Sequence, residues 1–168
     1  MTKLIAVNAE GCTGCRTCEL VCSIVHYGES NPSRAAIRVV RREKRGLAFS
    51  LPLVCQQCEK AACLEACPTG AISQDPERGT LAIDHGMCVG CGDCLGACPA
   101  GCIFMDEENG IALACDLCGG EPQCVAFCHA RCLNLIDRIP GSEAHSVERL
   151  ADILGTDPFA AAQEKRSH

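Results

Sequence analysis

The chain has 168 residues, a formal net charge of −6 and 18 cysteines, with no tryptophan, one tyrosine and four phenylalanines. The acidic balance argues against nucleic acid as a partner. The chain lacks an apolar run of about 18 residues, so we expect no membrane-spanning helix. Because aromatic residues are so few, metal-bound cysteines must supply part of the interior, and the metal-free chain is expected to be largely unfolded.

The first half of the chain predicts strands around a loop. Residues 3–8 alternate weakly and predict an edge strand that leads into the first cysteines. Residues 23–33 predict a loop that ends at Asn31-Pro32. Two β-rich runs, 37–42 and 47–53, flank a short turn and predict a hairpin.

The segment before the first cysteine is too short for a secretory signal and has no twin arginine, which favours the cytoplasm.

This hairpin region is unusually basic for an acidic chain. Its single acid is Glu43, and its basic residues are Arg34, Arg38, Arg41, Arg42, Lys44 and Arg45. Two interpretations stay open. The strip is either a solvated face, or a surface that docks an acidic partner or raises the potential of a nearby redox centre.

The second half repeats itself. The hexamer Cys67–Ile72 matches Cys98–Ile103, and Cys128–Leu133 is a third copy. A hairpin is expected after each of the first two copies, the first from 71–74 with 81–84 and the second from 103–106 with 111–114. In the second hairpin the turn contains Asn109-Gly110, a strong tight-turn pair.

Sixteen of the cysteines form four sets of four. The sets are Cys12, Cys15, Cys18 and Cys22; Cys55, Cys58, Cys63 and Cys67; Cys88, Cys91, Cys94 and Cys98; and Cys115, Cys118, Cys124 and Cys128. The third set, followed by Pro99, has the C-x₂-C-x₂-C-x₃-C-P spacing that binds [4Fe–4S] clusters in bacterial ferredoxins. Four sets therefore predict four [4Fe–4S] clusters. Zinc would use paired cysteines and would not explain this repeated spacing, and disulfides need an oxidising compartment.

The prolines predict how the sets combine. The second and third sets end in Cys-Pro, and the first and fourth do not. In a two-cluster module the fourth cysteine of each set ligates the other cluster. Pairing the inner sets and the outer sets predicts four ligand groups: Cys55, Cys58, Cys63 and Cys98; Cys67, Cys88, Cys91 and Cys94; Cys12, Cys15, Cys18 and Cys128; and Cys22, Cys115, Cys118 and Cys124.

Two cysteines and the histidines are left over. Cys102 and Cys132 occupy the hexamer position that Ala71 holds in the first copy, which predicts a small buried apolar site and no ligand role. The histidines share no common spacing, and each set already has four thiols, so none is expected to bind iron. They are His26, His85, His129, His145 and His168.

Over residues 3–137 this nested arrangement resembles the four-cluster electron-transfer subunits of molybdenum and tungsten enzymes, such as dimethyl sulfoxide reductase and formate dehydrogenase. It is also similar to the small iron–sulfur partners of certain hydrogenases and of carbon monoxide dehydrogenase. Segments 12–19 and 115–124 look closest to the small subunit of tungsten-dependent aldehyde oxidoreductases. Two departures stand out. His129 replaces a proline common in relatives, and the missing long insertions and anchoring tail of respiratory versions argue against a quinone or membrane partner.

The expected fold is α+β, with two ferredoxin-like two-cluster modules and a helical tail. Residues 1–34 and 115–137 form the outer module, 35–54 the basic hairpin, 55–114 the inner module and 138–168 the tail. In the tail, Ser146 is expected to cap a helix that places Val147, Leu150, Ala151 and Leu154 on one face, and a second helical stretch runs from Asp157-Pro158 to Lys165. The tail covers either the chain's own core or a partner.

The expected function is electron transfer without catalysis, because iron held by four thiolates has no open position for a substrate. The resemblance implies a tungsten or molybdenum catalytic subunit, for example an aldehyde oxidoreductase, with a flavin subunit or a ferredoxin as acceptor. Self-association is also open. Alternatives are a hydrogenase or carbon monoxide dehydrogenase subunit, a freely diffusing polyferredoxin, an enzyme with a labile cluster, and a zinc scaffold.

Overall fold

The computed structural model describes residues 2–44 and 47–138. The helices predicted for the tail lie outside these residues. In chain order the helices are η1 (Ala9–Gly11), α1 (Thr17–Tyr27), η2 (Pro32–Arg34), α2 (Ala62–Glu65), α3 (Asp93–Ala97), η3 (Leu117–Gly120) and α4 (Gln123–Ala126). The strands are β1 (Lys3–Val7), β2 (Ile37–Lys44), β3 (Leu47–Val54), β4 (Ile72–Gln74), β5 (Leu81–Ile83), β6 (Phe104–Asp106), β7 (Ile111–Leu113) and β8 (Leu133–Asp137). The fold is therefore α+β, as predicted.

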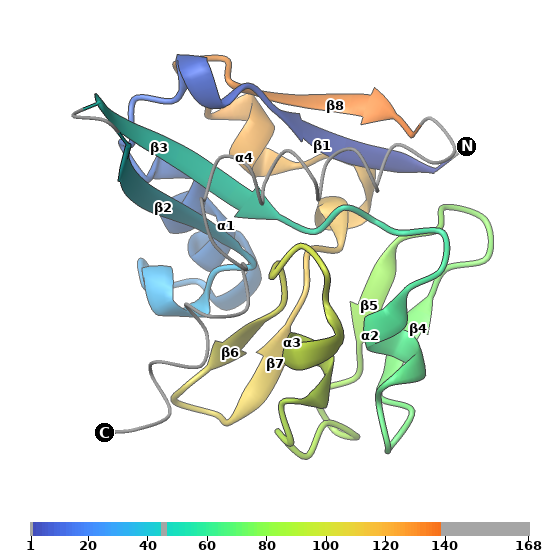
Figure 1. Cartoon of the computed structure of the whole chain (residues 1–168). Coiled ribbons are helices and arrows are strands. Elements are labelled where there is room, and N and C mark those ends of the chain that lie inside the picture. The colour runs from blue at the N-terminus through green and yellow to red at the C-terminus, as the bar shows by residue number, and fades with distance from the viewer. Residues whose placement is uncertain (1, 45–46, 139–168) are drawn as a thin grey trace.

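The strands form four antiparallel two-stranded sheets: β1 with β8, β2 with β3, β4 with β5, and β6 with β7. Figure 1 shows β1 and β8 side by side at one end of the molecule, and the hairpins β4–β5 and β6–β7 at the other. The pairing of β1 with β8 runs from Lys3 opposite Asp137 to Val7 opposite Leu133. It brings the first and last described strands of the chain together.

The predicted hairpins are confirmed, with small changes at their ends. The basic hairpin extends to Lys44 and Val54, and Ile37 lies opposite Val54 in its register. The two short hairpins have three residues per strand. The turn that contains Asn109-Gly110 closes with the Gly110 amide donating to the carbonyl of Asp106 at 2.8 Å.

The predicted loop after Cys22 is wrong in its first part. Helix α1 continues past Cys22 and ends at Tyr27. Its buried residues are Cys18, Glu19, Cys22 and Ser23. It is capped by Gly28, whose φ of 71° gives the left-handed conformation that glycine adopts at helix ends. The loop begins only there, and η2 follows it after the Asn31 cap.

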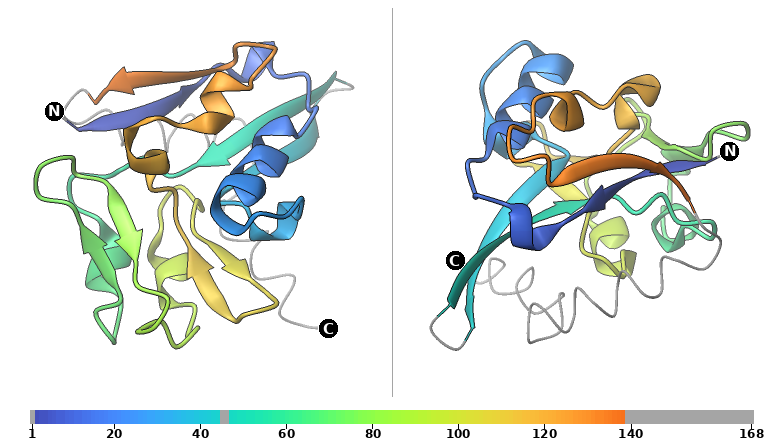
Figure 2. Two further views of the ribbon diagram at one scale, coloured as in Figure 1. Left: turned by 180° about the vertical axis from the view of Figure 1, so that it is seen from behind. Right: turned by 90° about the horizontal axis from the view of Figure 1, so that it is seen from above.

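Buried side chains form two core clusters. One contains Ile5, Cys18, Cys22, Ala35, Ala36, Ile37, Val39, Val54, Leu117, Cys124, Cys132 and Leu133. The other contains Cys55, Ala61, Cys63, Ile72, Leu81, Cys94, Cys98, Ala100, Cys102, Ile103 and Ala112. The helix α1, the strands β1 and β8 and the basic hairpin contribute to the first cluster. Figure 2 shows them on one side of the molecule and the two short hairpins on the other. Cysteines contribute to both cores, as the low aromatic content predicts.

The helices of the described ranges are all short. None has the length and the apolar character that crossing a lipid bilayer requires.

Candidate metal centres

A first cavity lies where the beginning of α1 meets the segment after α4. Its cysteines are Cys12, Cys15, Cys18, Cys128 and Cys132. The strand pair β1–β8 fixes this meeting, because it is extended by the Asn8 amide donating to the carbonyl of Cys132 at 2.8 Å. Residues more than a hundred positions apart thus present their thiols to one space.

A second cavity lies between the middle of α1 and η3. Its cysteines are Cys22, Cys115, Cys118 and Cys124, and His26 and Asp116 also line it. Within η3, Leu117, Cys118 and Gly119 all have positive φ, of 57°, 49° and 68°. The turn is held by Asp116, whose Oδ1 accepts a hydrogen bond from the Cys118 amide at 2.8 Å. This unusual backbone presents the Cys118 thiol to the cavity.

A third cavity lies between the two short hairpins. Its cysteines are Cys67, Cys88, Cys91 and Cys94. The loop that carries Cys88, Cys91 and Cys94 passes so close to the β6–β7 turn that a Cβ on Gly90 would lie 2.0 Å from the carbonyl oxygen of Gly110.

The remaining thiols of the sets are Cys55, Cys58, Cys63 and Cys98. Three of them, Cys55, Cys63 and Cys98, lie in one core cluster. Burial raises the pKa of Cys63 to about 11, and the next contributions come from the charges of Cys98 and Cys58. Burial also raises the pKa of Cys55, again with Cys98 and Cys58 among the neighbouring charges. These thiols are therefore close enough to act on one another.

The chemistry of these groups fits iron–sulfur clusters. All 18 cysteines are free, so no disulfide competes for their sulfur atoms. Backbone amides point at several of these sulfurs: Ala36 donates to Cys22 at 3.4 Å, Cys102 to Cys98 at 3.3 Å, and Ala112 to Cys88 at 3.4 Å. Such donors stabilise negative charge on thiolate sulfur.

Burial raises the pKa of several thiols in these groups, whereas hydrogen bonds lower the pKa of Cys15 and Cys67. Burial raises the pKa of Cys18 and of Cys124 to about 12, and of Cys22 and Cys94 to about 11. Metal binding requires thiolates, so iron must displace these protons when it binds. Only two cysteines of the sets, Cys15 and Cys91, are exposed.

The surplus cysteines are both buried, as predicted. The Cys102 thiol is 1% exposed and donates to the carbonyl of Ala100 at 3.2 Å. The Cys132 sulfur lies 3.5 Å from that of Cys128, beside the first cavity. The Cys102 thiol therefore donates its hydrogen to a backbone carbonyl, whereas the Cys132 sulfur contacts another thiol.

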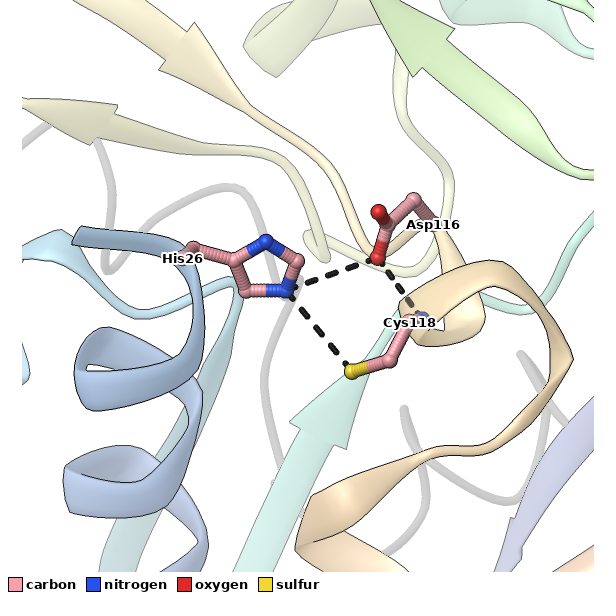
Figure 3. A group of neighbouring side chains, drawn as sticks. All are labelled: His26, Asp116 and Cys118. Carbon is pink, nitrogen blue, oxygen red and sulfur yellow. Dashed lines mark hydrogen bonds and ion pairs between the residues drawn. The ribbon is translucent and has the colours of Figure 1, made fainter. Parts of the chain in front are cut away.

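Two histidines contact thiols, although they come from distant parts of the chain. His26 Nε2 is 3.7 Å from Cys118 Sγ and 3.5 Å from Asp116 Oδ1 (Figure 3). His129 Nδ1 is 3.7 Å from Cys15 Sγ. Sequence spacing gives no hint of either contact, because the partners are 92 and 114 residues apart.

Three buried polar side chains that brace the site were missed from the sequence. Glu19 accepts a hydrogen bond from the Val39 amide and so ties α1 to β2. The side-chain amide of Gln57 donates to the carbonyl of Cys115 at 2.6 Å and accepts from the Leu81 amide at 3.0 Å. Asp106 accepts from Arg34 at 2.9 Å. Each of these three side chains has a hydrogen-bond partner at least 20 residues away, and no local pattern identifies that contact.

Comparison with known proteins agrees with the cysteine chemistry. The chain is 38% identical over 125 residues to the "Aliphatic sulfonate oxidoreductase, polyferredoxin-like subunit" of Pyrococcus furiosus, over 74% of this chain and 70% of that one. It is 32% identical over 163 residues to the "Electron transport protein HydN" of Escherichia coli K12, over 82% and 90% of the two chains. A chain of the solved "Active site complex BamBC of Benzoyl Coenzyme A reductase in complex with Benzoyl-CoA" is 29% identical, with a TM-score of 0.49 and 97% coverage of both chains.

The family described as "4Fe-4S dicluster domain" matches residues 47–138, more than half of the chain. This stretch includes the second, third and fourth cysteine sets and the third cavity. The chain belongs to the 4Fe–4S dicluster domain family.

Proposed function

We propose that this chain is a non-catalytic subunit that carries four [4Fe–4S] clusters and passes single electrons within an oxidoreductase complex. It would connect a catalytic subunit with an acceptor such as a flavin subunit or a ferredoxin. The observation that carries the proposal is that each of three cavities is lined by all four thiols of one proposed ligand group, with Cys132 as an additional lining thiol in the first.

The proposed ligands are the crossed groups expected from the sequence. They are Cys12, Cys15, Cys18 and Cys128; Cys22, Cys115, Cys118 and Cys124; Cys67, Cys88, Cys91 and Cys94; and Cys55, Cys58, Cys63 and Cys98. The lining of the three cavities supports the first three groups. The mutual influence of Cys58, Cys63 and Cys98 supports the fourth.

We further propose two modules, an outer one from residues 1–34 and 115–137 and an inner one from 55–114, with the hairpin of 35–54 between them. The separation of the buried side chains into two core clusters supports this division. Cys115 packs against both clusters and marks their boundary.

The residues around these groups support redox chemistry without a substrate. A [4Fe–4S] cluster bound by four thiolates stores and releases one electron at a time. The protein's part is to bury the sulfurs, to exclude water from most of them and to supply amide donors. With four thiols in each group, no iron position is left open for a substrate.

The partner is proposed from the resemblance and from the relatives. Two relatives are named as an electron-transport protein and as the polyferredoxin-like subunit of an oxidoreductase. Similarity of the first and fourth cysteine sets to the small subunit of tungsten-dependent aldehyde oxidoreductases favours a tungsten or molybdenum catalytic subunit that oxidises a small substrate such as an aldehyde. We place this complex in the cytoplasm.

The test is elemental analysis of the tagged protein, purified without oxygen from its native host. Four clusters require about 16 iron atoms per chain. Tungsten or molybdenum should accompany the iron in a fixed ratio, together with a second polypeptide. A chain with this iron content and neither metal would contradict the proposed partner and favour a hydrogenase, a carbon monoxide dehydrogenase or a free carrier. Zinc in place of iron would contradict the whole proposal.

A further inference from the structure

Two histidines of the outer half point a ring nitrogen at a proposed iron ligand. His26, from α1, lies in the second cavity beside Cys118. His129, directly after Cys128, lies beside Cys15 of the first cavity. The two contacts have the same length, 3.7 Å, although they come from unrelated segments and use different ring nitrogens.

The neighbours of His26 decide which atom carries the hydrogen. Its Nε2 faces the Cys118 sulfur and a carboxylate oxygen of Asp116 (Figure 3). A metal-bound thiolate and a carboxylate only accept hydrogen bonds. Nε2 must therefore carry a hydrogen, in the neutral ring as well as in the imidazolium, so the assignment does not depend on the charge of His26.

The same reasoning applies to His129. The Cys15 thiolate only accepts, so Nδ1 of His129 carries the hydrogen. The two sites differ in their access to water. His26 and His129 are both exposed residues, but the Cys118 partner of His26 is half-buried, whereas the Cys15 partner of His129 is exposed. Water can replace a lost donor more easily at His129.

In the inner half, residues 55–114, the donors to sulfurs of the proposed ligand groups include the amides of Cys102 and Ala112, and the Thr69 hydroxyl lies 3.6 Å from Cys67. Backbone amides occur in both halves, since Ala36 donates to Cys22. The imidazole contacts to Cys118 and Cys15 both lie in the outer half.

We propose that His26 and His129 are tuning residues, which donate N–H···S hydrogen bonds to Cys118 and Cys15 and raise the reduction potentials of the two outer sites. This inference rests on the proposed function. Adding one electron at such a site makes or breaks no bond, and the ring hydrogen stays on the histidine. The added negative charge spreads onto the sulfurs and strengthens the hydrogen bond, which favours the reduced state.

The test compares paired variants of the fully loaded protein in redox titrations followed by electron paramagnetic resonance at one fixed pH. His26→Phe keeps a ring but removes the donor. His26→Gln keeps an N–H donor. His26→Phe should lower the midpoint of one spectral component, by up to about tenfold in the one-electron equilibrium constant, or ~59 mV. His26→Gln should recover much of this shift.

His129→Phe should lower a different component, and by less, because water reaches this site. His85→Phe is the matched control, since His85 is exposed and makes no hydrogen bond to a sulfur among the described residues. Iron analysis of every variant separates the two proposals. Full iron with unchanged midpoints in both Phe variants would overturn the tuning role and leave the proposed function standing.

Loss of about four iron atoms from His26→Phe would make His26 a ligand, and would also overturn the tuning role. A parent protein without iron would overturn the proposed function itself, and this inference with it. Full iron, a lowered midpoint in His26→Phe and recovery in His26→Gln would support it.

Discussion

Arg34 Nε donates to Asp106 Oδ2 at 2.9 Å, and this ion pair joins the two halves of the molecule. Arg34 closes η2, directly before the core residue Ala35 of one cluster, and Asp106 ends β6 beside the other. The Asp106 side chain is 1% exposed. It also accepts from the amides of Glu108 and Asn109 and so fixes its own turn.

Removing this carboxylate should loosen both the turn and the contact between the halves. We expect Asp106→Ala to destabilise the loaded protein by about 3 kcal/mol, because it breaks a buried pair and orphans the turn amides. Asp106→Asn keeps an oxygen for the turn and should cost less. The measurement is the apparent Tm under argon, followed by the visible absorption; equal Tm values for Asp106→Ala and the parent would contradict the bracing role.

Crossed ligation predicts which site each fourth cysteine serves. Cys98→Ser should disturb the same spectral component as Cys63→Ser, because both belong to one proposed group. Cys102→Ala should keep full iron, since alanine occupies the equivalent position at Ala71. The components are resolved by electron paramagnetic resonance of the reduced protein. Agreement of Cys98→Ser with Cys94→Ser instead would show that the ligation is uncrossed.

The close approach of Gly90 to the β6–β7 turn predicts that this glycine cannot be replaced. Its φ is 67°, and a Cβ would collide with the Gly110 carbonyl oxygen. Gly90→Ala should cost about 2–4 kcal/mol through left-handed strain and overpacking. Gly96→Ala is the control, because no atom lies within 4 Å of its Cβ position and its φ is not positive. Thermal melts of the loaded variants test the pair, and equal melting would argue against the contact.

Removal of iron should unfold much of the chain. The cysteines form a large share of both cores, and metal binding supplies folding free energy in such proteins. We expect chelation under oxidising conditions to abolish most far-ultraviolet circular dichroism, and anaerobic reconstitution with iron and sulfide to restore it. A metal-free chain that kept its dichroism would show that side-chain packing alone suffices.

The basic residues of the hairpin region differ in their contacts: some bind other parts of the chain, and others are exposed. Arg34 binds Asp106, and Arg38 donates to the carbonyl of Pro32 at 2.7 Å and lies over the Phe104 ring. Arg41 is exposed. If the exposed part docks an acidic partner, Arg41→Glu should weaken complex formation, and more strongly at low salt.

The matched control for this prediction is Lys60→Glu, which reverses an exposed charge on another segment. Binding to the catalytic subunit is measured by light-scattering or calorimetric titration at two ionic strengths. Equal losses for Lys60→Glu and Arg41→Glu, which change the net charge equally, would show an effect of net charge alone. No loss for Arg41→Glu would make the strip a solvated face.

The sequence predicted the elements whose signals are local. β1, the basic hairpin and both short hairpins follow from alternation and turn residues, and their ends moved by a few residues at most. The helical residues Ser23–Tyr27 were predicted as loop because the Asn31-Pro32 stop was the stronger signal, although Gly28 is a helix-ending residue. The tail prediction lies outside the described residues.

Contacts between distant segments were beyond local patterns. Gln57 looks like an ordinary polar residue between Cys55 and Cys58, yet it is fully buried with a φ of 49° and bridges to Cys115. Its hydrogen bonds form only because the fold packs distant segments of the chain against one another. The same holds for His26 and His129, whose thiol partners come from opposite ends of the chain.

The pairing of β1 with β8 has a consequence for synthesis. The third cavity is complete once residues 67–112 have left the ribosome, whereas the first waits for Cys128 and for β8 to reach β1. Until then β1 keeps an open edge, and the thiols of α1 face no closed cavity. A nascent chain can therefore close its inner site early, and its outer sites only at the end of translation. The earliest cysteines to emerge are among the last to be enclosed.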